Sequence, residues 1–78
     1  MRTQPAKPPD TVAERLRKRR HAAELTQHEL AEQSGVSRSG IAKIELGIVH
    51  PELATLVLLS KALGVAVREL HPSLSGIA

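Results

Sequence analysis

The chain has 78 residues, of which 41% are hydrophobic, and it contains no cysteine, phenylalanine, tryptophan or tyrosine. This length and hydrophobic content are enough for one modest core. The lack of cysteine excludes disulfide bonds and thiolate metal sites. The lack of aromatic rings argues against single-stranded RNA or DNA as a ligand, because such sites generally stack bases on aromatic side chains. No apolar run approaches membrane-spanning length, and Pro8, Pro9 and Asp10 stand where a signal peptide needs apolar residues, so we expect a cytoplasmic protein without membrane contact.

Charge is unevenly placed along the chain. The formal net charge at pH 7 is +3, but residues 1–20 hold seven basic residues against two acidic ones, and the remainder is slightly acidic. A basic segment of this kind is typical of proteins that contact phosphate groups. The basic residues of R-L-R-K-R-R at positions 15–20 take different angles on a helix, so we expect only some of them to face such a partner. The alternative is a solvated helix surface.

The first predicted elements are an arm and a helix. Residues 1–9 are rich in proline and polar residues, which predicts a disordered N-terminal arm. A helix is predicted over residues 11–23, with Asp10 or Thr11 as its N-cap. Its core-facing side chains are predicted to be Val12, Leu16 and Ala23.

Two short helices joined by a glycine-marked turn are predicted next, in the segment TQHELAEQSGVSRSGIAKIELG at residues 26–47. Thr26 and Glu29 form a capping box that starts a helix over residues 27–34, and Gly35 stops it because glycine adopts a left-handed backbone most easily. Ser37 is the predicted N-cap of a helix over residues 38–46, which Gly47 ends. The helical spacing of apolar side chains predicts that five of them face inward: Leu30, Ala31, Val36, Ile41 and Ile44.

A fourth helix and a short fifth one are predicted after this segment. Pro51 suits the first turn of a helix that continues to residue 63, where Gly64 ends it. The inward stripe of this helix is predicted to be Leu53, Leu56, Leu59, Ala62 and Leu63. The fifth helix is indicated by three apolar residues, Val65, Val67 and Leu70. Pro72 should end it, and residues 73–78 are predicted to be a loose C-terminal tail.

These features together resemble the phage-repressor and Cro-like (XRE-type) helix-turn-helix family. The resemblance extends from ERLRKRRHAAELTQHELAEQSGVSRSGIAKIELG to HPELATLVLLSKALGVAVREL and covers roughly residues 11–71. It implies an all-α fold of five helices, in one DNA-binding domain over residues 10–72, with the helix-turn-helix at the second and third helices. The implied function is that of a sequence-specific, double-stranded-DNA-binding transcriptional regulator, and we expect a repressor.

The chemistry is expected on the outer side of the third helix. Ile41 and Ile44 point inward, so residues at the opposite angles point outward, which in this architecture is toward the major groove. The predicted base-reading residues are Arg38, Ser39 and Lys43. Arg38 is the first choice because a guanidinium can bond bidentately to O6 and N7 of guanine. Ser39 and Lys43 each suit a base or a phosphate, and the alternative for all three is an exposed side chain without a specific task.

The resemblance also implies contacts with the DNA backbone. In the family, the glutamine at the place of Gln27 meets a phosphate at the start of the second helix. Further phosphate-binding candidates are Ser37, Arg17 and Arg20. Arg20 and Glu45 match a structural ion pair that bridges the first and third helices and leaves one guanidinium edge for phosphate. If this pair were exposed, it would add under about 1 kcal/mol.

Two residues depart from the family's usual pattern. Gly40 stands where threonine or serine is common, and a glycine inside a helix costs roughly 1 kcal/mol relative to alanine. Leu46 stands where a polar or basic residue usually closes the third helix near a phosphate. One backbone contact of the family is therefore not expected here.

A homodimer is predicted from the fourth helix. Leu58 lies outside its inward stripe, near Ala54 one turn earlier, and Leu74 and Ile77 are expected to extend this surface. A two-fold dimer would place its recognition helices about 34 Å apart on a near-palindromic site. The alternative is a harmless exposed leucine.

Other functions have weaker support in the sequence. The four histidines lack ligand spacing, so we expect no metal, and nothing indicates a cofactor, an enzyme active site or a small-molecule effector. The main alternative is an antitoxin-type interaction protein that binds a partner protein and autoregulates its operon. The short tails disfavour this alternative.

Overall fold

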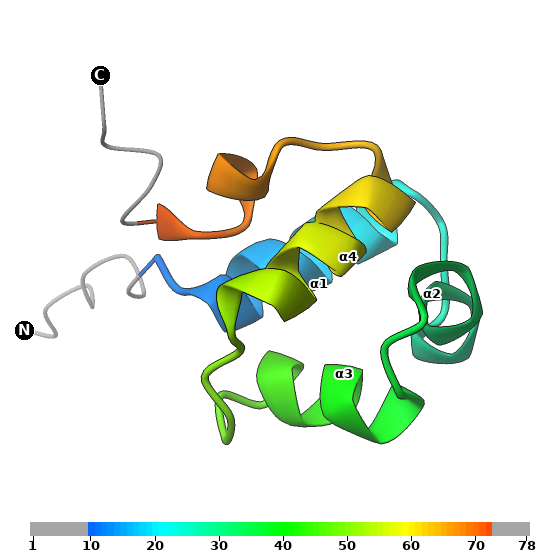
Figure 1. Ribbon diagram of the computed structural model, residues 1–78, viewed down its shortest axis with the longest axis horizontal. Helices are drawn as coiled ribbons and strands as arrows, with labels where there is room; N and C mark the ends of the chain where they lie inside the picture. The colour runs from blue at the N-terminus through cyan, green and yellow to red at the C-terminus, as the bar shows by residue number, and fades with distance from the viewer. Residues whose placement is uncertain (1–9, 73–78) are drawn as a thin grey trace, which may run out of the picture.

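The structure, a computed structural model, describes residues 10–72, and all regular elements in this part of the chain are helical (Figure 1). In chain order they are α1 (Val12–Ala22), α2 (Gln27–Ser34), α3 (Arg38–Glu45), α4 (Leu53–Leu63) and the 3-10 turn η1 (Val67–Glu69). Helix α1 packs against α3, α2 packs against α3 and α4, and η1 packs against α4. None of the helices described is both long and apolar enough to cross a membrane.

Side-chain caps fix where the first three helices begin. Thr11 Oγ1 accepts a hydrogen bond from the Glu14 N–H at 3.2 Å, and Ser37 Oγ caps α3 in the same way at 2.9 Å. At α2 the predicted capping box is present. The Glu29 N–H donates to Thr26 Oγ1 at 3.0 Å, and the Thr26 N–H donates to Glu29 Oε1 at 2.8 Å. Because each such cap stabilises a helix by about 1 kcal/mol, these residues determine the helix starts.

Glycine sets the turn between α2 and α3. Gly35 has φ +81°, in the left-handed region, and its N–H closes α2 by donating to the Ala31 carbonyl at 2.9 Å. A side chain at this φ would be strained even though the space around Gly35 is open. The chain therefore changes direction within residues 35–37, and α3 follows directly on α2.

The core lies where the four helices and the end of η1 meet. Of the residues that the structure describes, eight apolar ones are buried there: Val12, Leu16, Leu30, Ile41, Ile44, Leu56, Leu59 and Leu70. Partly buried residues, among them Leu25, Ala31, Val36, Ala62 and Leu63, pack against them. Burying a Leu, Ile or Val side chain contributes about 1.5–3 kcal/mol, so Ile41 and Ile44 hold α3 firmly on this core.

The predicted fifth helix is instead the single turn η1. A longer α-helix would need an N–H at Pro72 to bond the carbonyl of Arg68, and proline has none. The guanidinium of Arg15 replaces that bond, since its Nη1 donates to the carbonyls of Arg68 at 3.2 Å and Glu69 at 3.3 Å. Residues 10–72 therefore form four helices and a 3-10 turn rather than five helices.

The start of α4 and two side chains near helix ends also differ from the prediction. Helix α4 begins at Leu53 rather than at Pro51, because the backbone of Glu52 is extended, with φ −73° and ψ 158°. Leu53 then occupies the first helical position and is 59% exposed, so it does not belong to the inward stripe. Ala23 is likewise exposed, because α1 ends before it and Ala23 serves as the C-cap.

Candidate nucleic-acid interface

Helix α3 buries one side and exposes the other. Ile41 is fully buried and Ile44 is 3% exposed, which fixes the rotation of the helix about its axis. Arg38, Ser39 and Lys43, the three residues predicted to read bases, are all exposed. Ser39 and Lys43 lie one turn apart on the solvent side, and Arg38 occupies the first position of the helix. The predicted base-reading residues therefore lie on the exposed side of α3, and the buried side of the same helix holds it on the core.

The carboxylate of Glu45 is the polar anchor of α3. Arg20 Nε donates to Glu45 Oε2 at 2.7 Å and Arg20 Nη2 donates to Glu45 Oε1 at 2.8 Å, with side chains only 10% and 4% exposed. Gln27 Nε2 adds a third bond, to Glu45 Oε1, at 3.1 Å. Donors from α1 and α2 therefore meet on one carboxylate of α3. The ion pair that the resemblance implies is present and buried, so α3 cannot turn about its axis without breaking it.

The protonation of Glu45 reflects this setting. Burial alone raises the pKa of the carboxyl, because a charge is less well solvated inside the protein. The hydrogen bonds from Arg20 and Gln27, together with the charges of Arg20 and Arg17, outweigh burial and bring the pKa of Glu45 below its ordinary value of 4.5. Glu45 is therefore ionised in the native protein at neutral pH.

Stability should fall in acid because of this carboxylate. The pKa of Glu45 is lower in the folded than in the unfolded chain, so its contribution is complete above its ordinary value of 4.5 and is lost as pH falls through the folded-state pKa. Urea unfolding at pH 7, 5, 4 and 3 should show this loss. The control is the double variant Arg20→Met, Glu45→Met, whose unfolding free energy should change less over the same range. Equal pH dependence of the two proteins would contradict this assignment.

Arg20 and Gln27 use their donors inside the protein. Arg20 Nη1 donates to the Leu25 carbonyl at 2.9 Å, and the residue is 9% exposed, so all three guanidinium nitrogens bond protein groups. Gln27 lies at the start of α2, where the resemblance places it, but its Nε2 is directed to Glu45. Both residues are suited to assist DNA binding by holding α3 in place. Direct phosphate contact by either stays a prediction.

The two other phosphate candidates lie at opposite ends of α3. Ser37 caps the start of the helix as a hydrogen-bond acceptor and keeps its hydroxyl proton to donate. Arg17 is exposed, and its Nη1 donates to the backbone carbonyl of Glu45 at the other end at 3.1 Å. A guanidinium has five donors, so this bond leaves others for a phosphate. The two candidates therefore flank the exposed surface of α3.

In the part of the chain that the structure describes, some basic residues of α1 pair with carboxylates of the protein and others do not, in line with their different helical angles, but the sequence did not indicate which residues pair. Arg15 pairs with Asp10 at 2.6 Å and Arg19 pairs with Glu69 at 2.7 Å, so both hold neighbouring segments. Arg17 and Lys18 are exposed. The one sequence feature that could have indicated these pairs is Glu69, an acidic residue at the end of η1, which lies against α1. Arg17 and Lys18, two of the five basic residues in the run, are therefore the ones best suited to phosphate contact.

This arrangement of α2, α3 and their anchors matches a known family. The sequence profile of the helix-turn-helix family HTH_3 matches residues 16–70, which include all of α2 and α3 together with Arg20, Gln27 and Glu45. The chain belongs to this family. Its members are DNA-binding transcriptional regulators of the XRE type and are not enzymes.

Curated relatives of the helix-turn-helix family include a repressor and a control protein. The immunity repressor protein of Bacillus phage phi105 is 42% identical over 57 residues, which are 73% of this chain and 40% of the phage protein. Control protein C.SmaI of Serratia marcescens is 38% identical over 61 residues, which are 78% of this chain and 73% of that protein. The chain spans less than half the length of the phage repressor and of two further curated relatives.

Solved structures of the family share the fold. The restriction-modification controller protein C.AhdI from Aeromonas hydrophila superposes with a TM-score of 0.73 and 37% sequence identity. The similarity covers 76% of this chain and 89% of the controller protein. The helix-turn-helix and the helices that carry it therefore form the common fold.

Helix α4 carries an exposed apolar surface that lies apart from the reading helix of this family. Ala54 and Leu58, the two residues predicted for a dimer interface, are exposed, with Leu58 at 46%. Leu53 and Val57 lie beside them, 59% and 39% exposed. The spacing of these four residues is that of one helix side, and we call them the α4 outer surface. Leu74 and Ile77 lie outside the described residues.

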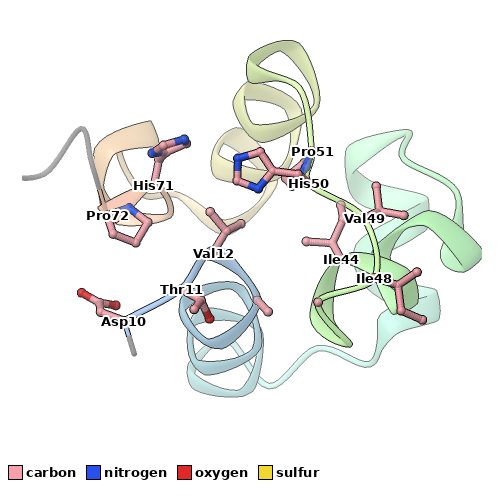
Figure 2. A pocket seen from close by; sticks show the side chains of 12 residues that line it. Asp10, Thr11, Val12, Ile44, Ile48, Val49, His50, Pro51, His71 and Pro72 are labelled. Atoms are coloured by element: carbon pink, nitrogen blue, oxygen red, sulfur yellow. The ribbon is translucent and has the colours of Figure 1, made fainter. Parts of the chain in front are cut away.

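A pocket of about 520 Å³ opens between the start of α1, the segment after α3 and the residues that follow η1 (Figure 2). Apolar side chains such as Val12, Ile44 and Ile48 line it, and the rings of His50 and His71 meet edge to face with their centroids 6.1 Å apart. Within residues 10–72 no group of three or more His, Cys, Asp or Glu could hold a metal ion. The pocket includes only the inner side of α3, at Ile44, so it is separate from the reading surface.

Proposed function

We propose that the chain is a sequence-specific, double-stranded-DNA-binding transcriptional repressor that reads the major groove with α3. The observation that carries the proposal is the exposure of Arg38, Ser39 and Lys43 on a helix whose rotation is fixed by the buried Glu45 contacts. Membership of the helix-turn-helix family supports it. The choice of repression rests on the similarity to a phage immunity repressor.

The proposed contacts follow from the chemistry of each side chain. Arg38 would donate two N–H groups from one edge of its guanidinium to O6 and N7 of a guanine, while Ser39 and Lys43 would bond the next base edges or a phosphate. Arg17 and Ser37 would bond phosphates at the two ends of α3 and so set the register of the helix on the duplex. The fixed orientation of α3 favours such base contacts, because a bidentate hydrogen bond tolerates little change in angle.

Selection of bound sequences from a random double-stranded DNA pool tests this function. The full chain should recover one motif that contains a guanine at the position read by Arg38. Its affinity for this motif should exceed that for random DNA by about a thousandfold or more at physiological salt. Recovery of no motif, with only weak binding that disappears as salt is raised, would contradict the proposal.

We further propose that the protein acts as a homodimer through the α4 outer surface. Leu53, Val57 and Leu58 expose apolar area on one side of one helix, and a two-fold axis would bring two such surfaces together. The recognition helices would then lie about one DNA turn, roughly 34 Å, apart. The selected motif should therefore be close to a palindrome, with half-sites spaced by one turn.

The variant Leu58→Glu should weaken dimerisation. A carboxylate placed in the apolar contact removes the burial of leucine and adds an unpaired charge, so the dimer dissociation constant should rise by about tenfold or more. Sedimentation equilibrium measures this change, and cooperative filling of the two half-sites should disappear with it. Ile48→Glu, at an exposed apolar residue outside α4, is the control and should leave self-association unchanged. A wild-type protein that is monomeric at all concentrations and binds one per site would refute the dimer.

A further inference from the structure

Within residues 10–72, Leu46 is the most exposed of the large apolar side chains, at 73%, and it is the C-cap of α3. Its backbone stays helical, with φ −83° and ψ −7°, and its N–H donates to the Ala42 carbonyl at 3.0 Å. Ser39, Lys43 and Leu46 are therefore spaced i, i+4 and i+7 along one stripe of the helix. Two residues of this stripe are polar candidates for base contact, and the third is a leucine.

A leucine on this stripe cannot take part in the hydrogen-bond readout of bases. It has neither donor nor acceptor, and it does not belong to the core cluster. In the major groove the one apolar feature that distinguishes base pairs is a methyl group on C5 of a pyrimidine. Contact with such a methyl would bury apolar surface on both sides, which is favourable in water. Ala42, half-buried one turn before Leu46, keeps the adjoining surface apolar as well.

We infer that Leu46 is a specificity-determining residue that recognises the C5-methyl group of a pyrimidine, carried by thymine or by 5-methylcytosine. The inference rests on the proposed function, because it requires α3 to lie in the major groove. Leu46 follows Arg38 by eight residues, which is about 12 Å along a helix that rises roughly 1.5 Å per residue. With about 3.4 Å between successive base pairs, the methyl would lie within about four base pairs of the guanine read by Arg38.

Removal of single methyl groups from the selected DNA site tests the inference directly. Each thymine of the site is replaced in turn by deoxyuridine, which pairs identically and lacks only the C5-methyl group. At one position per half-site, within about four base pairs of the Arg38 guanine, the replacement should weaken wild-type binding about fourfold, the value of burying one methyl-sized group. The variant Leu46→Ala should bind the thymine and deoxyuridine sites equally. Because Leu46 is exposed, the variant should fold as the wild type does, and circular dichroism checks this.

Cytosine and 5-methylcytosine at the same position distinguish the two sources of the methyl group. If the methyl is read from either base, wild-type protein should prefer 5-methylcytosine to cytosine by a similar factor, and Leu46→Ala should not. If the methyl is read only from thymine, wild-type protein should bind the cytosine and 5-methylcytosine sites with equal affinity, while deoxyuridine still weakens binding. Either result supports the role of Leu46.

The matched control is Ile48→Ala. Ile48 is 69% exposed, but it lies in the segment after α3 and lines the pocket near the start of α1. This variant should keep the full preference for the methylated site. The inference is overturned if wild-type protein binds every deoxyuridine site as well as the thymine site, or if Leu46→Ala keeps the preference. In those cases the selected motif still stands, whereas a selection that recovers no motif overturns the DNA-reading function itself.

Discussion

Replacing Arg20 with methionine should lower the free energy of unfolding by about 3–5 kcal/mol, the typical effect of removing one partner of a buried ion pair. The Glu45 carboxylate, which is 4% exposed beside Arg20 in the native protein, would keep only the bond from Gln27, so its charge would be poorly compensated. Equilibrium unfolding in urea measures the change. DNA affinity should fall too, because α3 would lose the contact that fixes its rotation.

Two comparisons separate the buried pair from a general loss of arginine. The double variant Arg20→Met, Glu45→Met should recover most of the stability, since no unpaired charge remains. Arg19→Met removes an arginine of the same helix whose partner is Glu69, and these side chains are 44% and 34% exposed. Its effect should be under about 1 kcal/mol. Similar losses for Arg19→Met and Arg20→Met would contradict the central place given to Glu45.

Replacing Arg38 with alanine should weaken binding to the best DNA site by about 1–3 kcal/mol and relax the preference at one base pair. The loss should be confined to sites with guanine at that position, because the bidentate bonds go to its O6 and N7 atoms. Replacing this guanine with 7-deazaguanine, which lacks the N7 acceptor, should weaken wild-type binding but not that of the variant. Fluorescence anisotropy titrations provide the affinities.

Arg17→Ala is the matched control for Arg38→Ala. Arg17 is exposed at the other end of α3 and is a candidate for phosphate contact. Its replacement should weaken all sequences alike and reduce the slope of log K against log salt concentration by about one, because phosphate contacts carry no sequence information. An unchanged selected motif in Arg38→Ala would remove Arg38 from the reading residues.

The helices could be predicted from local signals in the sequence. The capping box of Thr26 and Glu29 and the stop at Gly35 give α2 its observed bounds, Gln27–Ser34. The helical spacing of the apolar residues likewise identifies the buried side of α3. Both signals, helix caps and apolar spacing, depend only on residues that are near neighbours in the sequence. The predicted start of α4, at Pro51, was two residues too early. Proline suits the first turn of a helix, but it equally suits the extended segment that precedes a helix.

The partners of charged residues were less predictable. Arg15, Arg19 and Arg20 are near neighbours in one basic run, yet they bind Asp10, Glu69 and Glu45 respectively. Which arginine meets which carboxylate depends on how α1 packs against η1 and α3, and sequence spacing does not encode that packing. The inward direction of the Gln27 side chain was missed for the same reason. The Arg20 and Glu45 pair came from the family resemblance and not from local pattern.

Mapping of the DNA contact on the protein tests the central proposal most directly. Nitrogen-15-labelled protein would be titrated with the selected duplex, and the backbone and arginine side-chain signals followed by NMR. The proposal predicts the largest changes at Arg38, Ser39 and Lys43, with smaller ones at Ser37 and Arg17, and intermolecular contacts between Arg38 and a guanine. Changes confined to the α4 outer surface or to the pocket beside His50, with α3 unaffected, would contradict it.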